Sequence, residues 1–301
     1  MILCGRHAFR FVGVLLCTAL WLGPAAAQST MVRMHTTLGP VDIRLLDAEA
    51  PATVANFLGY VRSGAYNSTF LHRSVPGFIV QGGGFSWPLG ASTHTNVPAG
   101  PPVINEYSAS RSNVRATVAM AKLGSSPNSA TNQWFFNLAN NASNLDNQNG
   151  GFTVFGRVTT PGMAVVDSIA ALQVANAGGV SAAFTELPIL RFPSDNRLSR
   201  SIVVLVDRAE ELPTAASDAD RAFNYLEATY WRFLKPPGSV SGTAAAGGVT
   251  YYYRFYPASN SYIGLSVPGN EVFYLVPEVG PNITRFSTLA DLMPTVAAAG
   301  Y

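Results

Sequence analysis

The sequence has little cysteine, histidine or charge. Its two cysteines, Cys4 and Cys17, fall within the first 27 residues, and 12% of the 301 residues are charged. After residue 27 there is thus no cysteine for a disulfide, a thiol nucleophile or a cysteine-ligated metal. The three histidines there, His35, His72 and His94, lack the helical His-x-x-x-His spacing of a zinc site, so we expect no metal.

The first 27 residues have the order of a secretory signal peptide. Two arginines precede an apolar run of about a dozen residues, and small residues follow at Ala25, Ala26 and Ala27. A membrane span needs roughly 20 residues, so we predict cleavage after Ala27, with a retained membrane anchor as the alternative. Cleavage removes Arg6 and Arg10 and leaves 17 basic against 17 acidic residues. This balance predicts no nucleic-acid partner, and the leader predicts a periplasmic protein, with a secreted or outer-surface location as alternatives.

Residues 28–207 are typical of one mainly β domain. Alternating apolar residues on either side of Leu38-Gly39-Pro40 predict a hairpin. Helical spacing in residues 50–66, with Pro51 in the first turn, and again in residues 161–172 predicts two helices. About eight short strands accompany them, which favours a barrel or sandwich over alternating βαβ units.

The composition changes after residue 207. Residues 208–219 (RAEELPTAASDA) are interpreted as a linker, and residues 220–301 as a small α+β domain of unknown role. The aromatic runs TYYYRFY, SYIGLSV and EVFYLV in this domain predict strands separated by turns. We interpret their tyrosines as cross-strand packing on a small sheet, with a binding face as the alternative.

One arginine stands in the apolar run FLHRSVPGFIVQGGG, residues 70–84. A buried guanidinium without partners is costly, so Arg73 needs acceptors or solvent. Pro76 and Gly77 interrupt the strand and let Arg73, Phe78 and Gln81 converge on one concave surface. Glutamine can hold a guanidinium without cancelling its charge. The pattern predicts a cation directed at a ligand, with a solvent-facing arginine on an edge strand as the alternative.

Two motifs in this order resemble those of the cyclophilins, the peptidyl-prolyl cis–trans isomerases. The first is FLHRSVPGFIVQGGGF, and the second is VAMAKLGSSPNSATNQWFFNLA followed by LDNQNGGFTVFGRV. With the hairpin and both helices, the resemblance covers roughly residues 31–207. It implies a closed eight-stranded antiparallel β-barrel with two helices, to which the C-terminal α+β domain is appended.

The resemblance also implies a set of site residues. Arg73 would be the catalytic arginine, Gln81 its orienting partner and Phe78 part of the same catalytic group. The proline ring and the substrate backbone would contact Ile79, Ala121, Lys122, Gln133, Phe135, Leu145 and Phe152. Trp134 and Phe136 would face the opposite way, into the core.

The sequence departs from the family pattern at three places. Ser143-Asn144 stand where many members have a tryptophan, Phe152 stands where many have a histidine, and Lys122 replaces a common asparagine. Without that tryptophan the chain lacks its indole N–H donor, which implies weak or no binding of cyclosporin-type inhibitors. An aromatic residue at position 152 keeps the pocket apolar.

We therefore expect an exported, monomeric prolyl isomerase that acts on proline-containing segments of exported proteins and needs no cofactor. Two alternatives stay open. The barrel could bind proline segments without turnover, or the tyrosine-rich C-terminal domain could act as a surface adhesin or scaffold.

Overall fold

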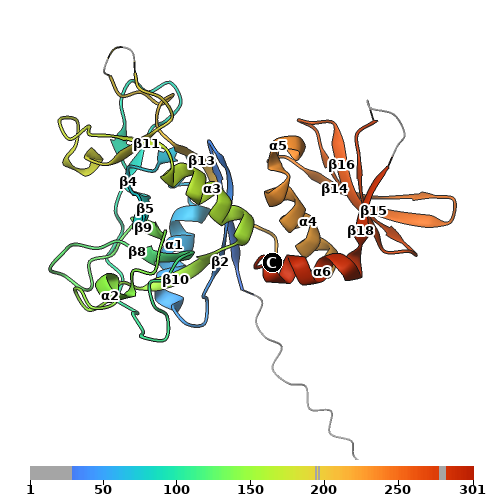
Figure 1. Cartoon of the computed structure of the whole chain (residues 1–301), viewed down its shortest axis with the longest axis horizontal. Helices are drawn as coiled ribbons and strands as arrows, with labels where there is room; N and C mark the ends of the chain where they lie inside the picture. The colour runs from blue at the N-terminus through green and yellow to red at the C-terminus, as the bar shows by residue number, and fades with distance from the viewer. Residues whose placement is uncertain (1–28, 194, 196, 278–282) are drawn as a thin grey trace, which may run out of the picture.

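The computed structural model describes residues 29–193, 195, 197–277 and 283–301. The predicted signal peptide, residues 1–27, lies outside the described residues. Figure 1 shows a β-barrel domain followed by a second domain that carries the C-terminal end of the chain. Among the described residues, no helix is both long enough and apolar enough to cross a membrane.

Eight strands form the barrel, paired antiparallel in the order β4-β5-β9-β8-β10-β2-β1-β13. Their bounds are β1 Met31–Thr36, β2 Gly39–Leu45, β4 Arg73–Val75, β5 Ile79–Gly82, β8 Thr117–Met120, β9 Trp134–Asn137, β10 Val154–Val158 and β13 Leu205–Glu211.

The barrel is closed by the short strand β3 (Thr69–Phe70), which precedes β4 in one extended segment. Strand β3 pairs with β13, while β4 pairs with β5. Between them, the amide of Leu71 donates to Val204 and the amide of His72 donates to Gln81. One segment thus joins the first and last strands of the order, which confirms the predicted eight-stranded barrel. Two further short strands, β6 (Phe85–Ser86) and β7 (Thr95–Asn96), extend the sheet beyond β3.

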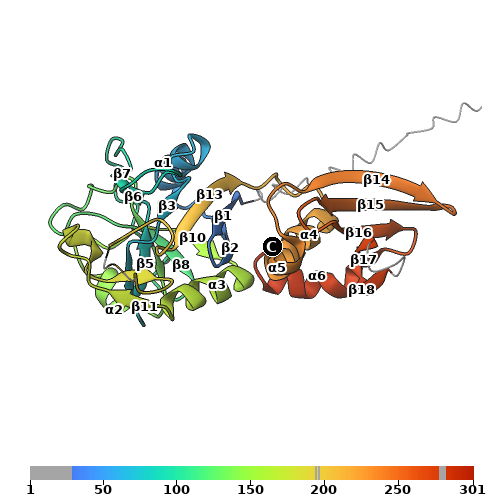
Figure 2. The ribbon, with the colours of Figure 1, turned by 90° about the horizontal axis from the view of Figure 1, so that it is seen from above.

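The two predicted helices are present as α1 (Pro51–Arg62) and α3 (Thr160–Ala170), on opposite sides of the barrel (Figure 2). Pro51 opens α1, where the carboxylate of Glu106 accepts hydrogen bonds from the next two amides. The hydroxyl of Thr159 accepts from the amide of Gly162 at the start of α3. A one-turn helix, α2 (Ala142–Leu145), was not predicted.

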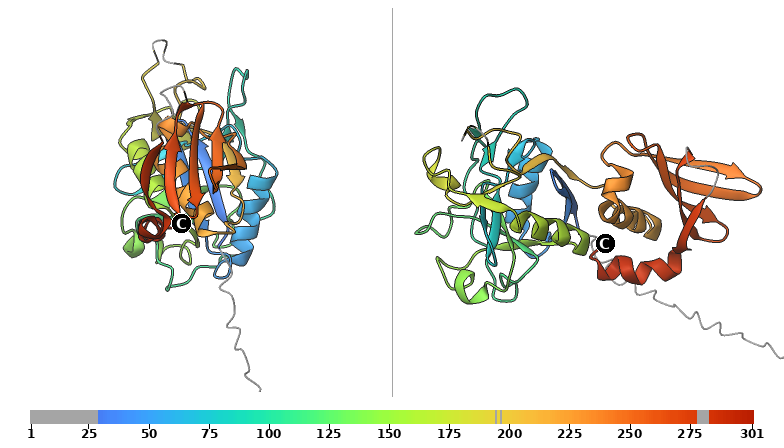
Figure 3. Two further views of the ribbon diagram at one scale, coloured as in Figure 1. Left: turned by 90° about the vertical axis from the view of Figure 1, so that its right-hand side faces the viewer. Right: turned by 45° about the horizontal axis from the view of Figure 1, so that its top comes forward.

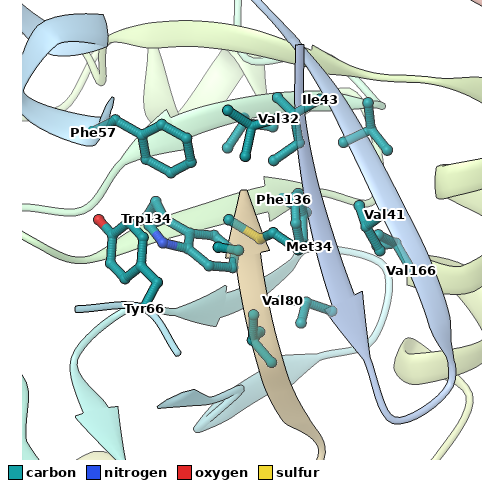
Figure 4. Packing of buried hydrophobic residues seen from close by; sticks show 14 of the residues in the cluster. Val32, Met34, Val41, Ile43, Phe57, Tyr66, Val80, Trp134, Phe136 and Val166 are labelled. Carbon is teal, nitrogen blue, oxygen red and sulfur yellow. The ribbon is translucent and has the colours of Figure 1, made fainter. Parts of the chain in front are cut away.

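The barrel interior is filled by alternate residues of the strands. Val32, Met34, Val41 and Ile43 of the first hairpin point toward Trp134, Phe136 and Phe57 (Figure 4). All seven of these side chains are at most 1% exposed. Trp134 and Phe136 therefore face inward, as predicted. A separate hairpin lies beside the barrel and is formed by β11 (Gln173–Ala175) and β12 (Leu187–Ile189), with the 3-10 turn η1 (Ala182–Phe184) between them.

Among its described residues, the second domain has three helices and a five-stranded antiparallel sheet. The helices lie between the barrel and the sheet (Figures 1 and 3). Their bounds are α4 Asp218–Thr229, α5 Trp231–Leu234 and α6 Leu289–Ala298, and those of the strands are β14 Val240–Ala246, β15 Val249–Tyr256, β16 Ser261–Val267, β17 Glu271–Leu275 and β18 Thr284–Thr288. Strand β13 runs to Glu211, so its end occupies part of the segment 208–219 that was interpreted as a linker.

A buried ion network joins the two domains. Arg33 of β1, 2% exposed, donates to both carboxylate oxygens of Asp42 at 2.7 Å and to Glu227 of α4 at 2.6 Å. Burial disfavours the charged guanidinium, but the carboxylates of Asp42 and Glu227 together hold the pKa of Arg33 well above its usual value. Beside this network the indole of Trp231 covers Gly39, where a Cβ would lie 2.8 Å from the ring. The domains therefore meet through specific contacts at the β1–β2 hairpin.

Candidate active site

The predicted catalytic residues come together on the hairpin of β4 and β5. Arg73 and Gln81 are directly opposite each other in the pairing of these strands. Residues 76–78 form the turn, in which Gly77 has φ +73° and the amide of Phe78 donates to Val75. The interruption inferred from Pro76 and Gly77 is thus a tight hairpin turn, and it brings Arg73, Phe78 and Gln81 onto one short ribbon.

An apolar cluster lies next to this hairpin, and we refer to it as the candidate pocket. Ile79, Phe135 and Leu145 are buried in one cluster, and Phe78, Ala121 and Phe152 pack against it while remaining partly exposed. Strand alternation separates Phe135 from its neighbours in β9, which point into the barrel. The ring of Phe152 meets that of Phe135 edge-on, with centroids 5.8 Å apart. The structure therefore gathers the residues expected to hold a proline ring.

Gln133 borders the pocket next to Gln81. The side-chain amide of Gln81 donates to Oε1 of Gln133 at 2.8 Å, and the backbone carbonyl of Gln133 accepts from the amide of Ala121. Just after β5, Gly84 packs closely against Gln133, because a Cβ on Gly84 would lie 2.7 Å from the end of the Gln133 side chain. Gly84 thus leaves room for Gln133, while Gly82 and Gly83 lie against Trp134.

Lys122 holds a loop rather than standing free at the pocket. Its Nζ donates to the carbonyls of Asn149 and Gly151 at 2.8 and 2.5 Å and lies 4.8 Å from the centroid of the Phe152 ring. Partial burial lowers the pKa of Lys122. Lys122 was expected to contact the substrate. We interpret it as a support for the segment that carries Phe152.

The hydrogen-bonding partner expected for Arg73 was wrong. Within the part of the chain that the structure describes, the guanidinium donates through Nε to the carboxylate of Glu186 at 2.7 Å, and the Gln81 side chain bonds to Gln133. Glu186 lies just before β12, 113 residues from Arg73 in the sequence. Its segment, SAAFTELPIL, carries no motif. The one signal there was a lone acidic residue in an apolar run.

His72 lies behind the hairpin and is 1% exposed. Its ring meets that of Phe85 edge-on at 4.9 Å, and its Nδ1 has no hydrogen-bond partner among the described residues. Burial, with a smaller contribution from the charge of Arg73, lowers the pKa of His72 to about 4. His72 is therefore a neutral packing residue at pH 7.

The arrangement is a cation, held by Glu186, beside an apolar cluster. The described residues contain no cluster of three or more His, Cys, Asp or Glu side chains that could hold a metal ion. The charge and the pocket are suited to gripping an apolar ring and stabilising electron density that develops beside it.

Comparison with known proteins identifies the family. The family model described as cyclophilin type peptidyl-prolyl cis-trans isomerase matches residues 31–190, more than half of the chain. The chain belongs to this family. A peptidyl-prolyl cis-trans isomerase A of Dickeya dadantii is 44% identical over 169 residues, which are 56% of this chain and 85% of the relative. Peptidyl-prolyl cis-trans isomerase B of Escherichia coli is 39% identical over 152 residues, 49% of this chain and 88% of the relative.

A solved cyclophilin-type isomerase of Cryptosporidium parvum aligns with 62% of this chain and 98% of its own, at 19% identity and a TM-score of 0.45. Family membership rests on the sequence matches above. The family match ends at residue 190, so the C-terminal domain of this cyclophilin is an addition to the part that the match covers.

Proposed function

We propose that this cyclophilin accelerates cis–trans rotation about X–Pro bonds in exported proteins, with Arg73 as the catalytic cation. The observation that carries the proposal is the cross-strand placement of Arg73 opposite Gln81, beside the apolar cluster that contains Ile79, Phe135 and Leu145. The family supports the class of reaction. The leader-like first 27 residues support the choice of exported proteins as clients.

The physical problem is a slow rotation. Resonance gives the amide C–N bond a barrier of about 18–20 kcal/mol, and uncatalysed X–Pro exchange takes tens of seconds or longer. No bond has to be made or broken, so catalysis consists in favouring the twisted state over both planar states. In the twisted state the proline nitrogen regains a lone pair. A guanidinium N–H from Arg73 would stabilise that lone pair while leaving the planar states unaffected.

The apolar pocket contributes by holding the ring. Ile79, Phe135 and Leu145 would immobilise the proline ring while the acyl side of the peptide bond turns. Phe78 and Phe152, at the pocket margin, would shield the rotating bond from water. Gln81 and Gln133, joined to each other, would offer their remaining amide groups to the substrate backbone.

The experiment is an exchange assay on a short Xaa-Pro peptide with the chain from residue 28. We expect acceleration by the wild type and a loss of about a hundredfold in kcat/KM in Arg73→Ala, as is typical when a preorganised donor is removed. Arg62→Ala is the matched control, because that arginine also pairs with one carboxylate, that of Glu211, and lies at the end of helix α1. A well-folded wild type that binds the peptide without accelerating exchange would favour a non-catalytic binding module instead.

A further inference from the structure

The strongest contact of Arg73 is one that the family resemblance did not imply. Its Nε lies 2.7 Å from Oε2 of Glu186, and the two side chains are 35% and 38% exposed. Among the described residues, this is the hydrogen bond that the guanidinium makes, and it leaves both terminal nitrogens, Nη1 and Nη2, without a protein partner.

The backbone of Glu186 is fixed independently of its side chain. The carbonyl of Glu186 accepts from the amide of Ser74 at 2.7 Å, so the residue is attached to strand β4 directly beside Arg73. Two residues earlier, Phe184 is fully buried, with its ring 4.8 Å from that of Phe85 and 5.5 Å from that of Phe70. The carboxylate therefore reaches Arg73 from an anchored segment.

A bond at Nε has a specific consequence for a planar guanidinium. The group can still rotate about the bonds of its flexible stem when it has no partner, so most of its orientations would misdirect the donors. A carboxylate at Nε fixes the plane of the group but does not occupy the N–H groups of Nη1 and Nη2. A bidentate pair through the terminal nitrogens would fix the plane equally well and would block the substrate.

We propose that Glu186 is a positioning residue for the isomerase reaction, which orients the Arg73 guanidinium through Nε and keeps its terminal N–H groups available to the proline nitrogen. This inference rests on the proposed catalytic role of Arg73. The side chain of Glu186 acts through Arg73 and makes no contact with the peptide.

The test compares Glu186→Ala with Glu186→Gln in the chain from residue 28. We expect kcat for an Xaa-Pro peptide to fall about tenfold in Glu186→Ala, since misplaced groups lose rate steeply, with peptide affinity unchanged. Glutamine keeps an acceptor oxygen, so Glu186→Gln should retain activity within about threefold of the wild type. Asp167→Asn, which alters an ion pair of similar exposure with Arg115, should leave kcat unchanged.

A second readout separates positioning from a structural role. The Nε–H signal of Arg73 in a nitrogen-15 NMR spectrum should be protected from solvent exchange in the wild type and in Glu186→Gln, and lost in Glu186→Ala. The melting temperature should be nearly the same in all three, because the Ser74 to Glu186 backbone bond persists. Full activity of Glu186→Ala, or a loss of activity with the Arg73 signal intact, would overturn the inference.

The two proposals fail differently. If the wild type is inactive, or if Arg73→Ala is as active as the wild type, the proposed function is wrong. If Arg73→Ala is inactive while Glu186→Ala is fully active, the proposed function stands and the role of Glu186 is wrong.

Discussion

The side-chain amide of Gln81 donates to Oε1 of Gln133 at 2.8 Å, which links strand β5 to the residue just before the neighbouring strand β9. Gln81 stands opposite Arg73, so the pair of glutamines continues the row that begins with the proposed catalytic cation. The glutamine pair depends on Gly84, because a Cβ there would lie 2.7 Å from the Gln133 side chain.

Gly84→Ala should therefore displace the flexible Gln133 side chain and reduce kcat/KM for Xaa-Pro peptides about fivefold, a modest misplacement effect. Stability should change little, since the clash is with the end of a movable side chain. Gly124→Ala is the control, because a Cβ at that position meets no atom within 4 Å. Equal kcat/KM values for the two variants would show that the glutamine pair does not contribute to turnover.

Glu227 is expected to be the main polar support of the contact between the domains. It is 4% exposed, and Arg33 and Arg254 hold its pKa below the usual value although burial acts to raise it. Glu227→Ala leaves Arg33 with the carboxylate of Asp42 and the carbonyl of Asn224, and should lower the free energy of unfolding by about 3 kcal/mol in urea denaturation. Glu271→Ala, which removes an exposed pair with Arg285, should cost less than about 1 kcal/mol. Equal effects of the two changes would contradict a buried role for Glu227.

His72 should make stability depend on pH between about 4 and 6.5. Its pKa is lowered in the fold, so the unfolded chain binds the proton first as pH falls from 6.5. Protonation therefore favours unfolding and removes about 3 kcal/mol of stability by pH 4, at 1.36 kcal/mol per pKa unit. His72→Leu should flatten the curve of unfolding free energy against pH in this window. An unchanged slope in His72→Leu would assign the dependence to other groups.

We expect this protein to bind cyclosporin weakly because of the residues in helix α2. Its exposed residues Ser143 and Asn144 precede the buried Leu145 and carry no indole donor. Asn144→Trp should raise the affinity for cyclosporin by about tenfold, the gain from roughly one added hydrogen bond. Calorimetric titration of both proteins measures this, and tight binding by the wild type would contradict the expectation.

Local patterns in the sequence predicted much of the barrel. The apolar alternation around Leu38-Gly39-Pro40 and the helical spacing after Pro51 each reflect a single buried face, which neighbouring residues encode. The inward direction of Trp134 and Phe136 and the outward direction of Phe135 follow from the same period of two. The residues of the candidate pocket lie in the two motifs, and the structure packs them in one cluster; their role in binding stays a prediction.

Long-range contacts were not predictable in this way. Glu186 reaches Arg73 only because the β11–β12 hairpin folds back against β4, and no local pattern encodes that return. Strand β14 has a Ser, Gly and Ala composition with low strand preference, yet it pairs with β15 along its whole length. The buried partner of Arg33 is similarly supplied by α4, 194 residues away.

The most direct test of the account is the rate of cis–trans exchange in an Xaa-Pro peptide, measured by NMR with equal amounts of wild type and Arg73→Lys. Lysine keeps the positive charge but lacks the planar guanidinium with its fixed N–H donors. The account therefore predicts that exchange slows about thirtyfold or more, although the fold and the charge are retained. Equal exchange rates for the two proteins would contradict the assignment of Arg73 as the catalytic group.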